Sequence, residues 1–105
     1  MGNQQPDTIE VIKESVEERT QEPQMYRVLL HNDDYTTRDF VVEILVHIFH
    51  KPMDQAVELM WQVHRKGKGV AGVFPRDIAE TKVMSVTNLA REHGFPLLAT
   101  MEPEP

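Results

Sequence analysis

Three consecutive polar residues, Asn32, Asp33 and Asp34, and one histidine, His64, are the side chains best suited to hold a ligand. Two carboxylates, an amide and an imidazole provide hydrogen-bond acceptors. The carboxylates would attract a cation and repel a phosphate. The chemistry indicated is therefore recognition of a positively charged group.

Each of these residues also has a structural interpretation. Asn and Asp are common in turns and caps, because their side chains bond nearby backbone N–H groups. His64 follows Met60 by about one helical turn on an apolar helix face, where a lone histidine is usually a core residue. If it binds a ligand, a neutral imidazole can accept one hydrogen bond and donate another. The residue types alone leave both interpretations open.

Catalytic chemistry has weaker support. Four side chains have donor atoms that suit zinc, namely His31, Asp33, Asp34 and His64. No metal-binding spacing such as His-Glu-x-x-His is present, and the chain has no cysteine. We expect no metal and no cofactor. A metal-dependent hydrolase that uses His31, Asp33 and His64 remains an alternative.

The composition limits the class of protein. The chain has 105 residues, with 11 Lys and Arg, 17 Asp and Glu, and a net charge of −6 with His neutral. That length fits one domain, and the acidic balance argues against nucleic acid as the main partner. No apolar run approaches the roughly 20 residues of a membrane helix, and the N-terminus does not resemble a secretory signal. We therefore expect a cytoplasmic protein.

The charge is uneven along the chain. Residues 1–24 carry six acidic and two basic side chains and few apolar ones, so they cannot offset the entropy of ordering their backbone. We expect a flexible acidic N-terminal extension over residues 1–24, in which a short helix around residues 9–19 would be marginal. The core domain is expected over residues 25–105.

The first half of this core predicts one strand and two helices. The run from Met25 to His31 is rich in strand-forming residues. Thr36, with Asp39 three residues later, predicts a capping box for a helix with a 3.6-residue apolar period that Lys51-Pro52 ends. A second helix is expected from about Met53 to Arg65, followed by a turn over residues 67–69.

The second half predicts two strands around one helix. A strand is expected over Val70–Phe74, where Gly72 indicates a bulge or a close backbone approach. A helix follows from about residue 76 to residue 92, capped by Gly94. The last strand is expected over Leu97–Met101, before a short acidic end over residues 102–105. The order β-α-α-β-α-β predicts an α+β two-layer sandwich, with three helices on a three-stranded antiparallel sheet.

Six segments in this order and at this separation resemble one family. They are Tyr-Arg-Val-Leu-Leu-His-Asn-Asp-Asp-Tyr-Thr at 26–36, Phe-Val at 40–41, residues 60–64, Gly-Val-Phe at 72–74, Ala-Glu-Thr-Lys-Val at 79–83 and Pro-Leu-Leu-Ala-Thr at 96–100. Together they resemble ClpS, the bacterial adaptor that brings N-degron substrates to the Clp protease. The resemblance covers about residues 25–102.

The resemblance implies a monomeric binding protein and not an enzyme. The family recognises a free N-terminal α-ammonium followed by Phe, Tyr, Trp or Leu, and passes the substrate to the N-domain of the ClpA unfoldase. Carried over by position, the residues that hold the ammonium group and the first peptide bond are Asn32, Asp33 and His64. Those that line the side-chain pocket are Asp34, Thr36, Val41, Met60, Val63 and Leu97. Those that dock the unfoldase are Asp77, Glu80 and Lys82.

Two positions depart from the family pattern. Thr37-Arg38 stands where the family commonly has Pro-Met, whose Met acts as a gate over the pocket, so Arg38 alters the gate. His31 replaces an aliphatic residue, and we expect it to point to solvent and not to add a charge beside the ammonium site. The alternative within the same fold is therefore a protease regulator that docks the unfoldase but has an altered pocket.

Overall fold

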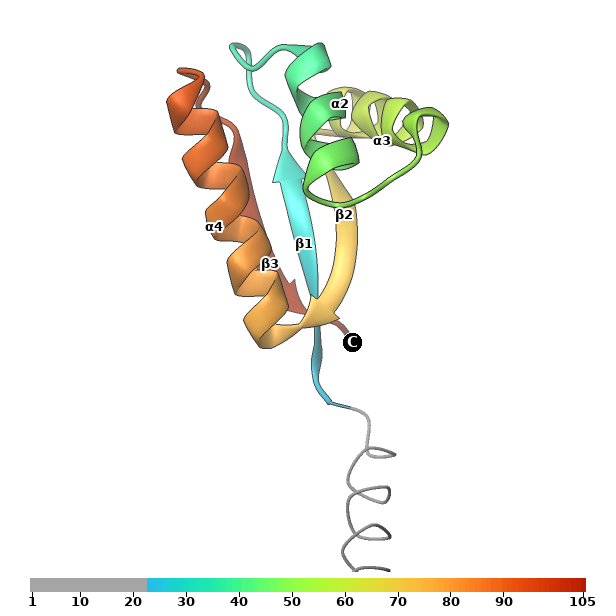
Figure 1. Cartoon of the computed structure of the whole chain (residues 1–105). Helices are drawn as coiled ribbons and strands as arrows, with labels where there is room; N and C mark the ends of the chain where they lie inside the picture. Colours follow the sequence, from blue (N-terminus) through green and yellow to red (C-terminus); the bar gives the residue numbers. More distant parts are fainter. Residues whose placement is uncertain (1–22) are drawn as a thin grey trace, which may run out of the picture.

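The computed structural model describes residues 23–105, which form three strands and three helices (Figure 1). In chain order they are β1 (Met25–His31), α2 (Arg38–His47), α3 (Met53–Lys66), β2 (Lys68–Pro75), α4 (Arg76–Glu92) and β3 (Leu98–Pro103). The predicted order and the α+β class are confirmed. The predicted N-terminal extension lies outside the described residues, except for its last two positions.

The sheet places its most apolar strand in the centre. The strand order is β2-β1-β3, and both pairs are antiparallel. Val28 and Leu30 of β1 are fully buried and belong to the core, with Ile44 and Leu45 of α2. Helix α4 packs against all three strands, whereas α3 packs against α2 and β2. Because β1 lies in the centre, the loop that follows it emerges between α2 and α4 (Figure 1).

Strand β2 contains the predicted irregularity. Val28 lies opposite Gly72 and Leu29 opposite Val70, so one residue of β2 is extra and forms a bulge. A Cβ atom on Gly72 would lie 2.6 Å from the Phe74 ring, so any larger residue there would force the ring to shift. Strand β2 also begins two residues earlier than predicted. The expected turn over residues 67–69 is wrong in its last two positions, because these pair with the end of β1.

Helix α2 is shorter at both ends than its apolar pattern indicates. Its N-cap is Thr37, whose Oγ1 accepts a hydrogen bond from the Phe40 N–H at 3.1 Å. The predicted cap, Thr36, is wrong by one residue because its hydroxyl donates to Asp33 instead. The helix ends at His47, and His50 then adopts a φ of 57°. The chain therefore leaves the helix before the predicted break at residues 51–52.

The end of α4 agrees with the prediction, and the end of the chain does not. Gly94 has a φ of 75°, and the Phe95 N–H donates to the Ala90 carbonyl at 2.8 Å, which closes the helix as a Schellman motif. Strand β3 begins one residue later than expected and continues to Pro103. The predicted start of the acidic end at residue 102 is therefore wrong by two residues: Glu102 lies opposite Arg27 in the sheet and forms an ion pair with it at 2.8 Å.

Among the helices that the structure describes, none combines the length and the apolar character that a membrane crossing requires.

Candidate functional site

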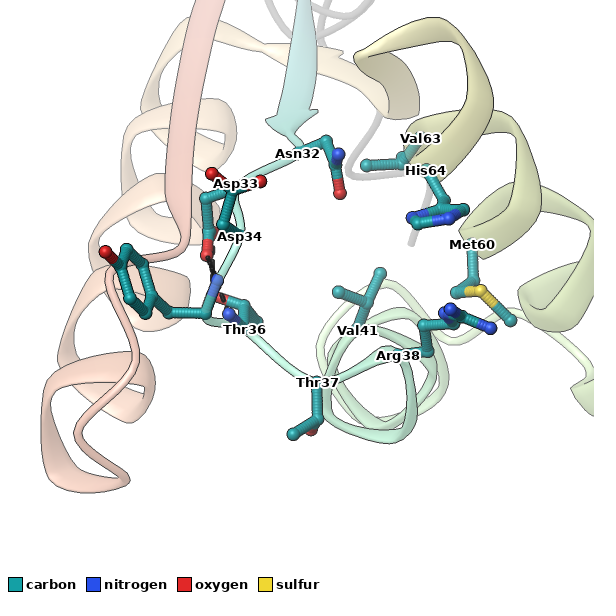
Figure 2. A pocket seen from close by; sticks show the side chains of 11 residues that line it. Asn32, Asp33, Asp34, Thr36, Thr37, Arg38, Val41, Met60, Val63 and His64 are labelled. Atoms are coloured by element: carbon teal, nitrogen blue, oxygen red, sulfur yellow. Dashed lines mark hydrogen bonds between the residues drawn. The ribbon is translucent and has the colours of Figure 1, made fainter.

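A pocket of about 370 Å³ opens between the loop after β1, the start of α2 and the C-terminal half of α3 (Figure 2). It is lined by Asn32, Asp33, Asp34, Tyr35, Thr36, Thr37, Arg38, Val41, Met60, Val63 and His64. Three separate segments of the chain thus meet here, and each supplies a different kind of side chain. The pocket has room for one large side chain.

Asn32 is held at the pocket by the end of α3. Its backbone N–H donates to the Gly67 carbonyl at 2.8 Å, and the Gly67 N–H donates to the Val63 carbonyl at 2.9 Å. Gly67 is the C-cap of α3 and has a φ of 90°, a conformation that glycine adopts without strain. This connection fixes the loop after β1 to the last turn of α3. The Asn32 side chain therefore points into the pocket, facing Val63 and His64 (Figure 2).

Asp33 organises the loop from within. Its Oδ1 accepts hydrogen bonds from the backbone N–H groups of Tyr35 at 2.8 Å and Thr36 at 2.6 Å, and its Oδ2 accepts one from the Thr36 hydroxyl at 2.7 Å. Partial burial acts to raise the pKa of Asp33, but these hydrogen bonds outweigh it and lower the pKa below its ordinary value. The turn interpretation is confirmed for this residue. The carboxylate is also held ionised at the edge of the pocket.

Asp34 adds a second carboxylate to the same side. Its side chain is exposed and forms no ion pair within residues 23–105. Figure 2 shows Asp33 and Asp34 on one side of the cavity and His64, Met60 and Arg38 on the other. The side formed by the loop therefore carries negative charge and attracts a cation.

The floor of the pocket is apolar. Val41 comes from the first turn of α2, and Met60 and Val63 come from one face of α3. All three are 7% exposed or less, so the pocket reaches down to the core. A ligand side chain that fills this floor would exchange water for apolar contacts.

The rim opposite the carboxylates is built around Trp61. The Arg38 guanidinium carbon lies 5.0 Å from the centre of the Trp61 ring, within the range of a cation–π contact. The His64 ring meets the same indole edge-on, with the ring centres 5.8 Å apart. Trp61 is half-buried and does not line the pocket, but it supports two residues that do.

Comparison with known proteins assigns the chain to a family. A family model described as "ATP-dependent Clp protease adaptor protein ClpS" matches residues 21–100. The chain belongs to the ClpS family.

Curated ClpS relatives match most of the chain. An ATP-dependent Clp protease adapter protein ClpS from Lawsonia intracellularis is 58% identical over 83% of this chain and 80% of its own. One from Desulforapulum autotrophicum is 48% identical over 99% of this chain and 100% of its own. Among solved structures, Agrobacterium tumefaciens ClpS2 bound to L-phenylalaninamide matches with a TM-score of 0.76 and 47% identity. That match covers 79% of this chain and 100% of the other.

The structure brings together nine of the ten binding residues that the ClpS resemblance predicts. These are Asn32, Asp33, Asp34, Thr36, Arg38, Val41, Met60, Val63 and His64. The tenth, Leu97, is 5% exposed and packs in the core without lining the pocket. Two further lining residues, Tyr35 and Thr37, are not among the predicted ones. Their position in the polar loop between β1 and α2 is the sequence feature that could have identified them.

His31 is not at the pocket. Its Nε2 forms a 2.7 Å hydrogen bond with the Thr100 hydroxyl on the neighbouring strand, and it is half-buried. The expected solvent-directed side chain is therefore wrong, and the disfavoured alternative, a charge beside the ammonium site, does not apply because His31 does not line the pocket. Because His31 is held at β3, it does not join Asp33 and His64 as the hydrolase alternative requires. Within residues 23–105, no group of three or more His, Asp or Glu side chains is arranged to hold a metal.

The three residues predicted to dock the unfoldase lie in the first two turns of α4, which begins at the end of the sheet away from the β1 loop (Figure 1). Asp77 and Glu80 are exposed, and Glu80 pairs with Arg76 at 3.1 Å. Lys82 differs, because its Nζ donates to the Ile48 carbonyl at 2.6 Å. It therefore ties α4 to the chain just after α2.

Proposed function

We propose that this ClpS-family chain binds proteins through a free, bulky hydrophobic N-terminal residue and delivers them to a ClpA-type unfoldase of the ClpAP protease. The side chains expected to bind are Phe, Tyr, Trp and Leu. The observation that carries the proposal is a pocket with an apolar floor and a carboxylate-bearing side. The solved relative supports it, because L-phenylalaninamide has the free ammonium, the side chain and the amide of an N-terminal Phe.

The polar half of the pocket suits an α-ammonium. That group offers three donors and one positive charge, and Asn32, Asp33 and His64 supply acceptors. Asp33 keeps about one acceptor site for a ligand after its three internal hydrogen bonds, since a carboxylate accepts about four. Each charge-assisted bond contributes roughly 1.5–3 kcal/mol. An acetylated or internal residue lacks the charge and would lose this contribution.

The apolar half suits the side chain that follows. Burying a Phe or Leu side chain against Val41, Met60 and Val63 contributes roughly 1.5–3 kcal/mol. Neither half alone binds tightly once the entropy of association is subtracted. The requirement for both halves provides the discrimination, because an N-terminal Ser has the charge but not the apolar volume.

Delivery requires a second surface that remains free when the pocket is filled. Asp77 and Glu80 at the start of α4 satisfy this condition, since both are exposed and neither lines the pocket. In this proposal Lys82 positions α4 through its bond to Ile48, and the two carboxylates contact the unfoldase. The chain acts as a monomeric cytoplasmic adaptor and does not cleave its substrate.

The decisive experiment measures fluorescence anisotropy of a labelled peptide that begins with Phe, beside the same peptide N-acetylated. Saturable binding of the free peptide alone is expected, because only it carries the ammonium. Equal binding of both peptides would overturn ammonium recognition.

Arg38 at the rim supports a second candidate, an unfoldase-docking regulator whose pocket no longer takes N-terminal residues. Normal binding to a ClpA N-domain, together with no affinity for peptides that begin with Phe, Leu, Tyr or Trp, would favour that candidate. Binding of the free Phe peptide would exclude it.

A further inference from the structure

The two sides of the pocket carry opposite charges. Asp33 and Asp34 lie on the loop side, and Arg38 lies on the side of the helices (Figure 2). Arg65, one turn after Trp61 on α3, places its guanidinium carbon 5.1 Å from the centre of the Trp61 ring, beside the 5.0 Å contact of Arg38. Two cations therefore gather around one indole at the rim of the pocket, where Arg38 also lines the cavity.

Neither cation is neutralised by the part of the chain that the structure describes. The ion pairs within residues 23–105 involve Arg27 and Arg76, and neither Arg38 nor Arg65 takes part in one. Both are exposed, although the chain as a whole is acidic. Stacking on Trp61 restrains both guanidinium groups, so less side-chain freedom is lost when they bind a ligand.

We propose that Arg38 and Arg65, stacked on Trp61, form a second subsite that binds a carboxylate side chain in the residues just after the N-terminal residue of a bound peptide. The inference rests on the proposed function, because the peptide's first residue sets the direction of the chain. The carboxylates of the loop hold its ammonium, and the apolar floor holds its side chain.

The backbone that follows must leave the pocket over its rim. An extended chain advances about 3.3–3.6 Å per residue. In this proposal the second and third residues pass the part of the rim where Arg38 and His64 lie against Trp61. An acidic side chain there would be attracted by both positive charges, and either guanidinium group matches the planar geometry of a carboxylate. A basic side chain there would be repelled.

The test compares three labelled peptides that begin with Phe and differ only at the next two positions, which are Asp-Glu, Ala-Ala or Lys-Lys. We expect the acidic peptide to bind roughly fivefold tighter than the neutral one, as exposed charge pairs allow, and the basic peptide to bind weaker. The preference should shrink when ionic strength rises, because salt screens exposed charges.

For each variant we compare the affinity for the acidic peptide with the affinity for the neutral peptide. This ratio is measured within one protein, so it does not depend on differences in overall affinity between variants. Arg65→Gln and Arg38→Gln should each lower this ratio, and the double variant should bring it close to one. Lys66→Gln is the matched control, since it removes the same charge from the next residue of α3, which makes no cation–π contact with the Trp61 ring. The control should keep the ratio of the unmodified protein.

The outcomes separate this inference from the proposed function. Equal affinity for the three peptides would overturn the second subsite and leave recognition of the N-terminal residue intact. An equal fall in the ratio for Lys66→Gln and Arg65→Gln would also overturn it, because the effect would then come from net charge. Absence of binding for all three peptides would overturn the proposed function together with the subsite.

Discussion

At the scale of single residues, Asp33 combines a structural role in the loop with a place at the pocket. It accepts three hydrogen bonds that shape the loop, and it presents a negative charge to the pocket. A substitution that removes the whole group therefore changes both loop and charge. Separating the two effects requires a pair of variants.

We expect Asp33→Ala to weaken binding of a peptide that begins with Phe by at least about tenfold, since it removes one charge-assisted contact. Asp33→Asn keeps an Oδ1 that accepts from the Tyr35 and Thr36 N–H groups, so it should lose the charge but retain the turn. Its affinity should fall between those of Asp33→Ala and the unmodified protein. Peptide titrations by anisotropy would measure all three, and unchanged affinity in Asp33→Ala would exclude Asp33 as a ligand of the ammonium.

The lowered pKa of Asp33 also predicts how stability depends on pH. A carboxyl group whose pKa is lower in the folded state stabilises the fold above its unfolded value of about 3.9. That contribution is lost as pH falls through the lower folded value. Thermal unfolding of the unmodified protein and of Asp33→Asn, followed from pH 7 to pH 2.5, should show a stability difference above pH 4 that shrinks below it. Curves that stay parallel over this range would contradict the assignment.

At the scale of the elements, the pocket depends on how two segments end. β1 ends where Asn32 begins the loop, and α3 ends at Gly67, whose carbonyl accepts from the Asn32 N–H. The φ of 90° at Gly67 directs this carbonyl toward the loop. The C-cap of a helix therefore takes part in shaping a site to which it contributes no side chain.

We expect Gly67→Ala to destabilise the fold by about 1 kcal/mol, because residues with a Cβ are strained at positive φ. No atom lies within 4 Å of the added Cβ, so the cost is conformational. Gly94→Ala is the matched control, with a φ of 75° and equal free space, but it lies at the end of α4. Chemical denaturation should show similar losses for both, whereas only Gly67→Ala should also weaken peptide binding. Equal peptide affinities would show that the Asn32 connection does not shape the pocket.

The sequence predicts the existence of these elements better than their ends. The apolar period of Phe40, Val41, Ile44 and Leu45 is enough to identify α2, since it reflects the face that the core covers. Its first residue depends on which threonine caps the helix, and that depends on the bond between Thr36 and Asp33. The last residues of β3 depend on Arg27, more than 70 positions away. Ends set by distant partners leave no local pattern.

For the candidate site too, local patterns are predictable and features set by distant partners are not. The loop residues and the α3 face are local patterns, and nine of the ten predicted residues meet at the pocket. The resemblance transfers a position but not the direction of its side chain, and Leu97 packs into the core. The place of His31 is set by its hydrogen bond to Thr100 across the sheet, which only the strand register reveals.

At the scale of the whole molecule, the loop after β1, which lines the pocket, and the start of α4, which carries the proposed docking residues, lie at different ends of the sheet (Figure 1). The two surfaces use different elements, since α2 and α3 form the pocket and the start of α4 carries Asp77 and Glu80. Substrate and unfoldase could therefore be held at the same time, as an adaptor requires.

This separation predicts the effect of a charge reversal. Glu80→Arg should weaken binding to a ClpA N-domain by at least tenfold while the affinity for a Phe peptide stays within about twofold, because the change is confined to α4. It costs little stability, since exposed ion pairs such as the one with Arg76 contribute about 0.3–0.5 kcal/mol. Glu58→Arg is the control. It makes the same charge reversal at an exposed position of α3 and should leave both affinities unchanged. Loss of peptide binding in Glu80→Arg would contradict the independence of the two surfaces.

The antiparallel pair of β1 and β3 places both ends of the described chain at the same end of the sheet. Tyr26 lies opposite Pro103, and the Glu104 N–H donates to the Met25 carbonyl at 2.8 Å. A force that pulls Gln24 and Pro105 apart would act along the hydrogen bonds between these strands, because such bonds run perpendicular to antiparallel strands. The hydrogen bonds between the two strands would then break one after another, and not all at once as they would under shear. Tension applied to the two ends would thus separate β3 from β1 gradually, beginning at the end of the sheet farthest from the pocket.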